Sequence, residues 1–308
     1  MPAPIAAIRS LMEYTKHDTS KTIHEFNEEA VKVASHLKES LNNSISISAG
    51  CDIFMRRTTK LALGDVMECK QSLLKELDEF LDEAKDYRNI VAKIGSQFIR
   101  DGHTILVHSY SRAILSLLKK AADQNKRFRV YVTESRPDCS GIKTAQELRS
   151  LDIPTKVILD TAVGYIIEKV DLVLVGAEGV VENGGLINKV GTYQLAIVAK
   201  EAKKPLYALT ESYKFVRLYP LNQYDLPSTN PALLTFEDCD NDNDDDIQNG
   251  ASEKNALKDT SSSLESQIQL QNPTLDYTPP EYITFLFTNL GVMTPSGVSD
   301  ELIKFYYV

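Results

Sequence analysis

Between residues 102 and 209, short apolar runs alternate with longer segments whose apolar residues recur every three or four positions. The short runs predict strands buried on both faces, and the segments between them predict helices. Strands that alternate with helices form parallel βαβ units, wound right-handed, so this part predicts an α/β sheet of Rossmann type. The predicted strands are Thr104–His108, Phe128–Thr133, Pro154–Leu159, Asp171–Ala177 and Pro205–Leu209, and the predicted helices are Ser111–Ala122, Lys143–Leu151, Ala162–Lys169 and Leu186–Lys203.

Residues 1–100 contain few glycines and show helical spacing throughout, which predicts an N-terminal helical domain ahead of a Rossmann-like domain at residues 101–308. One helix is expected over residues 23–41, capped by Asp18 or Thr19, and a shorter one over residues 48–63. A third pattern runs from Met67 to Arg100 and would measure roughly 45–50 Å as one helix. A helical bundle is therefore expected here.

The carboxyl-terminal part contains a polar insertion followed by two predicted helices. Residues 227–272 are rich in Ser, Asn, Asp and Gln and poor in aromatic residues, so we expect disorder there. The first helix is predicted to begin at Pro279 or Pro280 and to end at Gly291, with one apolar face made by Ile283, Leu286, Phe287 and Leu290. The second begins near Thr294, and its apolar end, with Tyr306 and Tyr307, predicts a buried seam between subunits.

The net charge of −9 over 308 residues is concentrated in one place, because residues 236–246 hold seven acidic residues and no basic one. The rest of the chain is nearly neutral, which argues against direct binding of nucleic acid. None of the four cysteines forms a CxxC pair, so no disulfide framework or zinc site is predicted. The absence of a secretory pattern and of a long apolar stretch predicts a cytosolic protein with no membrane partner.

Several predicted strands end in polar residues, which parallel strands would bring together at one edge of the sheet. This edge is the candidate ligand site, and its predicted residues are Ser109, Tyr110, Ser111, Arg112, Arg136, Glu178, Asn188 and Lys189. Simpler interpretations remain open. Ser111 could act only as a helix cap, Arg136 only in a surface ion pair, and Glu178 and Lys189 could be solvated around a tight turn at Asn183-Gly184-Gly185.

Other motifs are missing or ambiguous. The sequence has no GxGxxG, GxxxxGK[ST], GxSxG or HExxH motif, so no dinucleotide, nucleoside triphosphate or metal cofactor is predicted. Arg56, Arg57 and Lys60 form a basic cluster that is either a solvated face or a contact with an acidic or phosphorylated partner.

Five long segments resemble the alpha-subunit family of eukaryotic translation initiation factor 2B, and together they cover nearly the whole chain except the acidic insertion. They are ILVHSYSRA (105–113), VTESRP (132–137), VGAEGVVENGGLINKVGTYQLA (175–196), ESYKFVRLYPLNQYDLP (211–227) and DYTPPEYITFLFTNLGVMTPSGVSDELIKFYY (276–307). The resemblance implies a non-catalytic, regulatory subunit of a decameric guanine-nucleotide exchange factor. It implies a homodimer that joins beta, gamma, delta and epsilon subunits and senses initiation factor 2 phosphorylated on its own alpha subunit, while exchange is catalysed by epsilon.

The same fold is known in sugar-phosphate isomerases that act on methylthioribose 1-phosphate and ribose 1,5-bisphosphate, and these are similar around residues 171–199. The resemblance implies that the isomerases carry a catalytic cysteine, a catalytic aspartate and a glutamine at positions where this chain has Ser109, Glu178 and Ser140. It also implies that a pair of residues that holds the substrate is kept here as Asn188-Lys189. An arginine-proline pair that helps to hold phosphate is absent from residues 44–49.

These replacements bear on catalysis. A serine hydroxyl lacks the ionised form that a thiol offers near neutral pH. The extra methylene of Glu178 displaces the carboxylate by more than ~1 Å, enough to cost ~100-fold in a positioned step. We therefore predict a pocket that binds phosphate or a sugar phosphate without turnover, and the alternative is an isomerase of the ribose 1,5-bisphosphate type.

Overall fold

The computed structural model describes residues 1–41, 44–59, 65–226 and 272–307. Outside residues 229–274, the chain forms one compact unit that contains both the helical part and the sheet. The predicted insertion lies almost entirely outside the described residues, as does Lys60 of the basic cluster. The boundary predicted near residue 100 stays a prediction.

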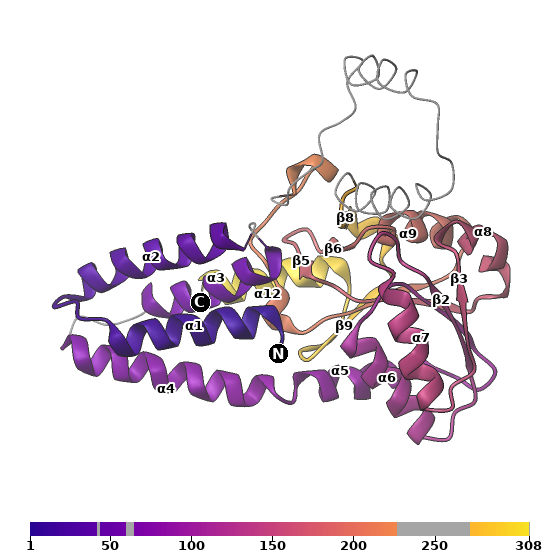
Figure 1. Cartoon of the computed structure of the whole chain (residues 1–308), viewed down its shortest axis with the longest axis horizontal. Helices are drawn as coiled ribbons and strands as arrows, with labels where there is room; N and C mark the ends of the chain where they lie inside the picture. Colours follow the sequence, from indigo (N-terminus) through magenta and orange to yellow (C-terminus); the bar gives the residue numbers. More distant parts are fainter. Residues whose placement is uncertain (42–43, 60–64, 227–271, 308) are drawn as a thin grey trace, which may run out of the picture. The chain divides into compact units, whose positions relative to one another are not determined.

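A seven-stranded sheet with the order β10-β9-β7-β4-β1-β2-β3 organises the second part of the chain (Figure 1). Neighbouring strands are parallel except for β10, which pairs antiparallel with β9, and this confirms the predicted Rossmann-like α/β fold. A smaller antiparallel sheet has the order β5-β6-β8. The strands are β1 (Thr104–Val107), β2 (Arg129–Thr133), β3 (Thr155–Ile158), β4 (Leu172–Val175), β5 (Gly179–Val180), β6 (Leu186–Lys189), β7 (Leu206–Leu209), β8 (Leu275–Thr278), β9 (Phe285–Thr288) and β10 (Gly291–Met293).

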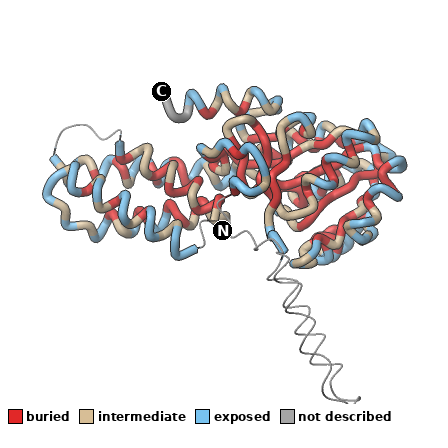
Figure 2. Tube along the Cα trace, turned by 90° about the horizontal axis from the view of Figure 1, so that it is seen from above, coloured by how far each residue is buried: buried red, intermediate tan, exposed pale blue. Residues whose placement is uncertain are grey.

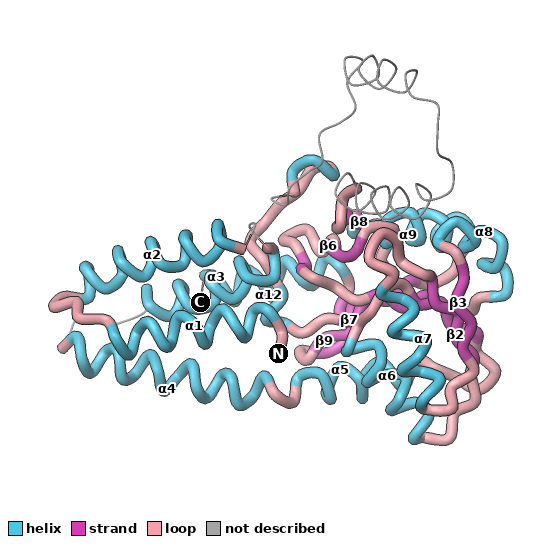
Figure 3. The backbone as a smooth tube through the Cα atoms, in the orientation of Figure 1, coloured by secondary structure: helices cyan, strands magenta, loops and turns pink. Residues whose placement is uncertain are grey.

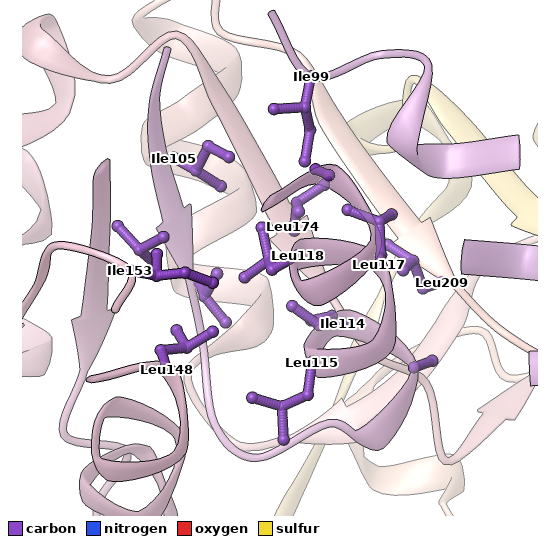
Figure 4. Close-up of a cluster of buried hydrophobic side chains, with 14 of the residues drawn as sticks. Ile99, Ile105, Ile114, Leu115, Leu117, Leu118, Leu148, Ile153, Leu174 and Leu209 are labelled. Carbon is purple, nitrogen blue, oxygen red and sulfur yellow. The ribbon is translucent and has the colours of Figure 1, made fainter. Parts of the chain in front are cut away.

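The central strands β1 and β4 of the large sheet are buried on both faces, because successive strand residues point to opposite sides and both sides are covered. Ile105 and Val107 of β1 join one apolar core, whereas Leu106 between them joins the other. Figure 4 shows part of the first core, where Ile105 and Leu174 face Ile114, Leu117 and Leu118 of a covering helix. The burial colours of Figure 2 show the same contrast between red strands and pale outer helix faces.

Three helices cover the first core and three cover the second. The first set is α5 (Tyr87–Ser96), α6 (Arg112–Asp123) and α7 (Ser140–Ser150), and the second is α8 (Val163–Ile166), α9 (Thr192–Glu201) and α12 (Pro295–Tyr307). Short 3₁₀ turns complete the connections at η1 (Asp160–Ala162), η2 (Ile167–Lys169), η3 (Ser212–Lys214), η4 (Gln223–Asp225) and η5 (Pro280–Tyr282). The side chains of residues 305–307 are outside the description, so the predicted seam at Tyr306 and Tyr307 stays a prediction.

The amino-terminal part is a bundle of four helices with its own apolar core (Figure 3). They are α1 (Ala3–His17), α2 (Ile23–Ser40), α3 (Ile45–Thr59) and α4 (Val66–Ala84). The sequence patterns of α2 and α3 were recognised, but α1 was not predicted as a separate helix. Thr22, rather than Asp18 or Thr19, caps α2 by accepting a hydrogen bond from the backbone N–H of Glu25.

The single helix predicted over residues 67–100 is wrong, because the chain forms α4 and then α5 with a break at Lys85 and Asp86. The two halves serve different cores. Leu73 and Leu77 of α4 pack in the bundle, whereas Val91 of α5 packs against α6 and the sheet. One continuous apolar stripe in the sequence cannot show that its two ends face different partners.

Two other segments predicted as helices contain strands in the structure. Leu186–Lys203 begins as β6, because Leu186 and Ile187 pair with β5 and β8, and only the later part forms α9. The segment after Pro280 forms a single 3₁₀ turn and then β9 and β10, with Leu286 and Phe287 buried in opposite cores. In both segments, apolar residues close together fit either structure, and tertiary strand pairing decides between them.

A buried ion pair joins α4 to the end of α1. The Lys70 ammonium lies 2.6 Å from a carboxylate oxygen of Asp18, and both side chains are less than a tenth exposed. Burial opposes ionisation of Asp18, but hydrogen bonds from Lys70, Tyr14 and Ser20 hold its pKa below the ordinary value.

Replacing Lys70 with Met is expected to lower the free energy of unfolding by about 3 kcal/mol, because it leaves Asp18 buried without its partner. The lowered pKa of Asp18 means that this stabilisation is present above about pH 4 and lost as pH falls. Urea unfolding measures the change, and Lys75→Met, in a surface pair with Glu79, serves as the control with little effect. Equal stability of the two variants would contradict the prediction.

Candidate functional site

The candidate site lies where the order of strands reverses. The chain builds β1, β2 and β3 outward in one direction and then returns to place β4 on the other side of β1. Ligands of open α/β sheets bind beyond the carboxyl ends of the strands at such a point. A cavity of about 400 Å³ lies here, next to residues 110–113 after β1 and residues 176–178 after β4.

Both parts of the compact unit contribute walls to this cavity. The bundle supplies Pro2, Ala3 and Pro4 at the start of α1, Ser46 of α3, and Arg88 of the adjoining α5. The α/β part supplies the strand ends together with Lys143, Asn188, Glu211 and Lys214. The site is therefore completed only when the helices pack on the sheet.

The loop after β1 is set by Ser109, whose backbone has a φ of 65° and whose side chain is buried. Its hydroxyl lies 2.9 Å from the hydroxyl of Ser140, and its carbonyl oxygen accepts a hydrogen bond from Thr144. This geometry leaves Ser109 outside the cavity lining and directs the next residues into it. Ser111 caps α6 and also lines the cavity, while its contact with a ligand stays a prediction.

Tyr110 forms one wall as a fixed ring. Its hydroxyl donates a hydrogen bond to Glu147 at 3.0 Å, and the Lys143 ammonium lies 4.3 Å from the ring centre. Burial and the nearby Glu147 raise the pKa of Tyr110, so its phenol stays protonated. Arg112 lies beside it at the exposed start of α6.

Glu211 is a buried carboxylate between two cations. Its oxygens lie 3.5 Å from Arg88 Nε and 3.2 Å from Lys214 Nζ, and its residue is 2% exposed. Burial alone would raise the pKa of Glu211, but Lys214 and Arg88 hold it below the ordinary value. Lys214 also donates to the carbonyl oxygen of Ala177, which ties the end of β4 to this cluster.

Glu178 is held by the helical bundle. The Ser46 hydroxyl of α3 lies 2.8 Å from the Glu178 carboxylate and 2.9 Å from its carbonyl oxygen. On the opposite side, Asn188 donates a hydrogen bond to Thr192 and lines the cavity. Gly176 keeps this corner open, because a Cβ there would lie 2.9 Å from the Ser111 hydroxyl oxygen.

Comparison with known proteins identifies the chain. The model of the "Initiation factor 2 subunit family" matches residues 1–295. The chain belongs to the initiation factor 2 subunit family. It is 47% identical to translation initiation factor eIF2B subunit alpha of Dictyostelium discoideum over 98% of this chain and 91% of the relative. It is also 32% identical to a ribose 1,5-bisphosphate isomerase of Archaeoglobus fulgidus, over 94% of this chain and 83% of that enzyme.

Solved structures of the family have the same fold. The chain is similar to eIF2B beta from Chaetomium thermophilum with a TM-score of 0.69 and 18% identity, covering all of this chain and 86% of that one. It is similar to a chain of the tetrameric eIF2B-beta2-delta2 complex from C. thermophilum with a TM-score of 0.71 and 18% identity, over 98% of this chain and 89% of that one.

In this family member, five of the eight predicted site residues line the cavity: Tyr110, Ser111, Arg112, Glu178 and Asn188. Three do not. Ser109 is buried behind the loop, Lys189 pairs with Asp138 at 3.1 Å, and Arg136 is largely exposed and faces Glu134 at 3.6 Å. Whether any of the eight binds a ligand stays a prediction.

The sequence reasoning missed Ser46, Arg88, Lys143, Glu211 and Lys214. Glu211 and Lys214 follow β7 directly, so the strand-end rule could have found them. Arg88 and Ser46 lie on helices distant in sequence and carry no local signal. His108 ends the first predicted strand. It is buried and bonds to Thr133 and to the carbonyl of Val190, and burial lowers its pKa.

Among the residues that the structure describes, no group of three His, Cys, Asp or Glu side chains is arranged to hold a metal ion. Within the same residues, no helix combines the length and apolar character that crossing a bilayer requires. Arg57 of the basic cluster bonds to Glu76 and lies over the ring of Phe80, which supports a structural role for that residue.

Replacing Glu211 with Gln is expected to lower the free energy of unfolding by about 2 kcal/mol, because Arg88 and Lys214 lose their buried counter-charge. The lowered pKa of Glu211 means that its stabilisation is present above about pH 4.5 and lost as pH falls, and the variant lacks this acid dependence. Chemical unfolding at several pH values measures both effects. Glu182→Gln, in a partly exposed pair with Arg217, is the matched control, and an equal effect there would contradict the prediction.

Proposed function

We propose that this chain is the alpha-type, non-catalytic regulatory subunit of the initiation factor 2B exchange complex, acting in the cytosol. The observation that carries the proposal is the 47% identity to an eIF2B alpha subunit over 98% of the chain. A second alpha subunit, from Caenorhabditis elegans, is 34% identical over the same share of the chain. Similarity of this extent includes both the bundle and the sheet, so it supports a shared role as well as a shared fold.

In this role the chain forms a homodimer and joins the beta, gamma, delta and epsilon subunits in a decameric core. The core senses initiation factor 2 phosphorylated on its alpha subunit, and exchange, which epsilon catalyses, is then inhibited. Contact with nucleic acid or membrane is not part of this role. The resemblance of the five long segments supports these finer statements.

The pocket is proposed to bind a phosphate or a sugar phosphate without converting it. Four cations line it, Arg88, Arg112, Lys143 and Lys214, against two carboxylates, Glu178 and Glu211. An excess of cations fits a dianionic phosphate monoester, while Ser111 and Asn188 offer hydrogen-bonding groups to hydroxyls.

The groups expected to move protons in the isomerases are engaged elsewhere here. Ser109 lies behind the loop with its hydroxyl bonded to Ser140, and Glu178 accepts a hydrogen bond from Ser46. A serine also lacks the accessible ionised form of a thiol. These contacts support binding without proton transfer.

A second candidate function is isomerisation of ribose 1,5-bisphosphate. It is favoured by the 32% identity to the A. fulgidus isomerase and by retention of Asn188 and Lys189, with Asn188 on the cavity wall. Family membership alone does not separate the two, because one fold hosts different functions.

Replacing Arg112 with Ala is expected to weaken binding of ribose 5-phosphate about tenfold, because an exposed cation at the cavity wall is lost without disturbing a buried pair. A thermal-shift titration with millimolar ligand measures affinity through the stabilisation of the folded chain. Arg136→Ala, outside the cavity, is the matched control and should bind like the wild type. Absence of stabilisation in the wild type would reject the ligand proposal.

Omitting this chain from the reconstituted exchange complex is expected to leave basal nucleotide exchange and to blunt its inhibition by phosphorylated initiation factor 2. The assay is release of labelled GDP from initiation factor 2, with phosphorylated and unphosphorylated factor in parallel. Strong inhibition that survives the omission would reject the regulatory assignment. Turnover of ribose 1,5-bisphosphate by the purified chain would favour the second candidate.

A further inference from the structure

Asp276 is a buried acidic residue just outside the pocket. It lies on β8, directly opposite Asn188 of β6 in the antiparallel register, and is only 8% exposed. It is not among the residues that line the cavity.

One oxygen of Asp276 holds the start of α9. Oδ2 accepts hydrogen bonds from the backbone N–H groups of Gly191 at 2.8 Å and Tyr193 at 2.9 Å. The other oxygen, Oδ1, is buried and has no hydrogen-bond partner within the described structure. The carboxylate is thus only half satisfied, which is costly if it carries a full charge.

The segment that Asp276 holds also orients the pocket residue Asn188. The Asn188 side chain donates to Thr192 at 3.0 Å, and Thr192 in turn donates to the carbonyl of Lys189 at 2.6 Å. Gly191, with a φ of 98°, lets the chain turn tightly against His108, where a Cβ would lie 2.9 Å from the ring. Movement of residues 190–193 would therefore move the groups that fix Asn188.

Among the residues that the structure describes, no side chain forms an ion pair with Asp276. Burial raises the pKa of Asp276 to about 7, against the opposing effect of hydrogen bonds from the backbone N–H groups of Tyr193, Gly191 and Thr192. The ionisable groups on the elements around it are His108 beyond β1, Lys189 of β6, Tyr193, Lys200 and Glu201 of α9, Tyr277 of β8 and Glu281 and Tyr282 of η5.

Three of these neighbours are neutral or already engaged. Burial lowers the pKa of His108, so its ring is uncharged at neutral pH. Lys189 pairs with Asp138, and contact with Tyr282 raises the pKa of Tyr193. The backbone N–H groups stabilise the ionised carboxylate only through Oδ2. Opening of the loop would let water hydrate Oδ1, which has no hydrogen-bond partner among the described residues.

We propose that Asp276 is a proton-sensitive clamp that positions Asn188: in its protonated form it holds residues 190–193 closed, and its ionisation favours an open loop. The consequence for ligand affinity rests on the proposed function of the pocket, whereas the clamp itself does not.

The direction follows from linkage. The closed form binds the proton more tightly than an open, hydrated form whose carboxyl has its ordinary pKa, so the closed form is favoured at low pH. This preference is lost as pH rises through about 7. The loop is therefore closed at pH 6 and opens more readily at pH 8.

Hydrogen exchange of the full-length chain tests the clamp. After correction for the intrinsic rate, protection of residues 190–193 in the wild type is expected to fall roughly tenfold between pH 6 and pH 8. Asp276→Asn is a neutral isostere whose amide oxygen can accept the same two hydrogen bonds, so its protection should be equal at both pH values. Asp171→Asn, which removes a carboxylate that accepts from Thr104 far from the loop, should behave like the wild type.

Two results would overturn the clamp: pH-independent protection of the wild type, or the same loss of protection in Asp276→Asn. A separate arm measures affinity for ribose 5-phosphate at both pH values. The ratio of wild-type to Asp276→Asn affinity should fall as pH rises, because only the wild type carries the ionisable carboxyl at this position. Titration of the ligand phosphate affects both proteins equally and cancels in the ratio. A constant ratio would contradict positioning of Asn188. If neither protein binds ribose 5-phosphate, the proposal that the pocket binds this ligand is rejected. The hydrogen-exchange measurement then decides by itself whether Asp276 acts as a clamp.

Discussion

Burial of both faces of the parallel sheet is the constraint on which the rest of this structure depends. Because adjacent residues of β1 enter opposite cores, two layers of helices are required, and the chain must cross over the sheet to supply them. The crossovers bring the carboxyl ends of all the parallel strands to the same edge of the sheet. The order in which strands are added reverses between β1 and β4. The pocket lies at that reversal, so its position follows from how the sheet is covered.

The pocket is finished by parts of the chain that do not belong to the sheet. Ser46 holds Glu178, and Arg88 faces Glu211, so the bundle and the α/β part meet through polar contacts at the cavity. A ligand placed there would touch both parts and would stabilise their packing. Such an arrangement would let binding without chemistry serve the regulatory role that we propose for this chain.

The chain is similar in sequence both to an eIF2B alpha subunit and to a ribose 1,5-bisphosphate isomerase. One fold can host different functions, so the individual side chains at the strand-end cavity decide whether protons can be moved there. At Ser109 the side chain is withdrawn behind the loop, and at Glu178 the carboxylate is bound by a neighbouring helix. Function in this family therefore has to be argued from side chains, with the fold as the shared background.

The sequence by itself determined most of the alternation of strands and helices from Thr104 to Leu209, the polar strand ends and part of the cavity's sheet-side wall, because these depend on local periodicity and on a general rule of parallel sheets. Only the tertiary structure decided that residues 186–189 and 285–288 are strands, that α4 and α5 separate, and that Lys189 and Arg136 lie outside the cavity. It alone brought Ser46 and Arg88 to the site. Contacts between residues far apart in the chain leave no local pattern, so packing had to select among structures that the local sequence allowed equally.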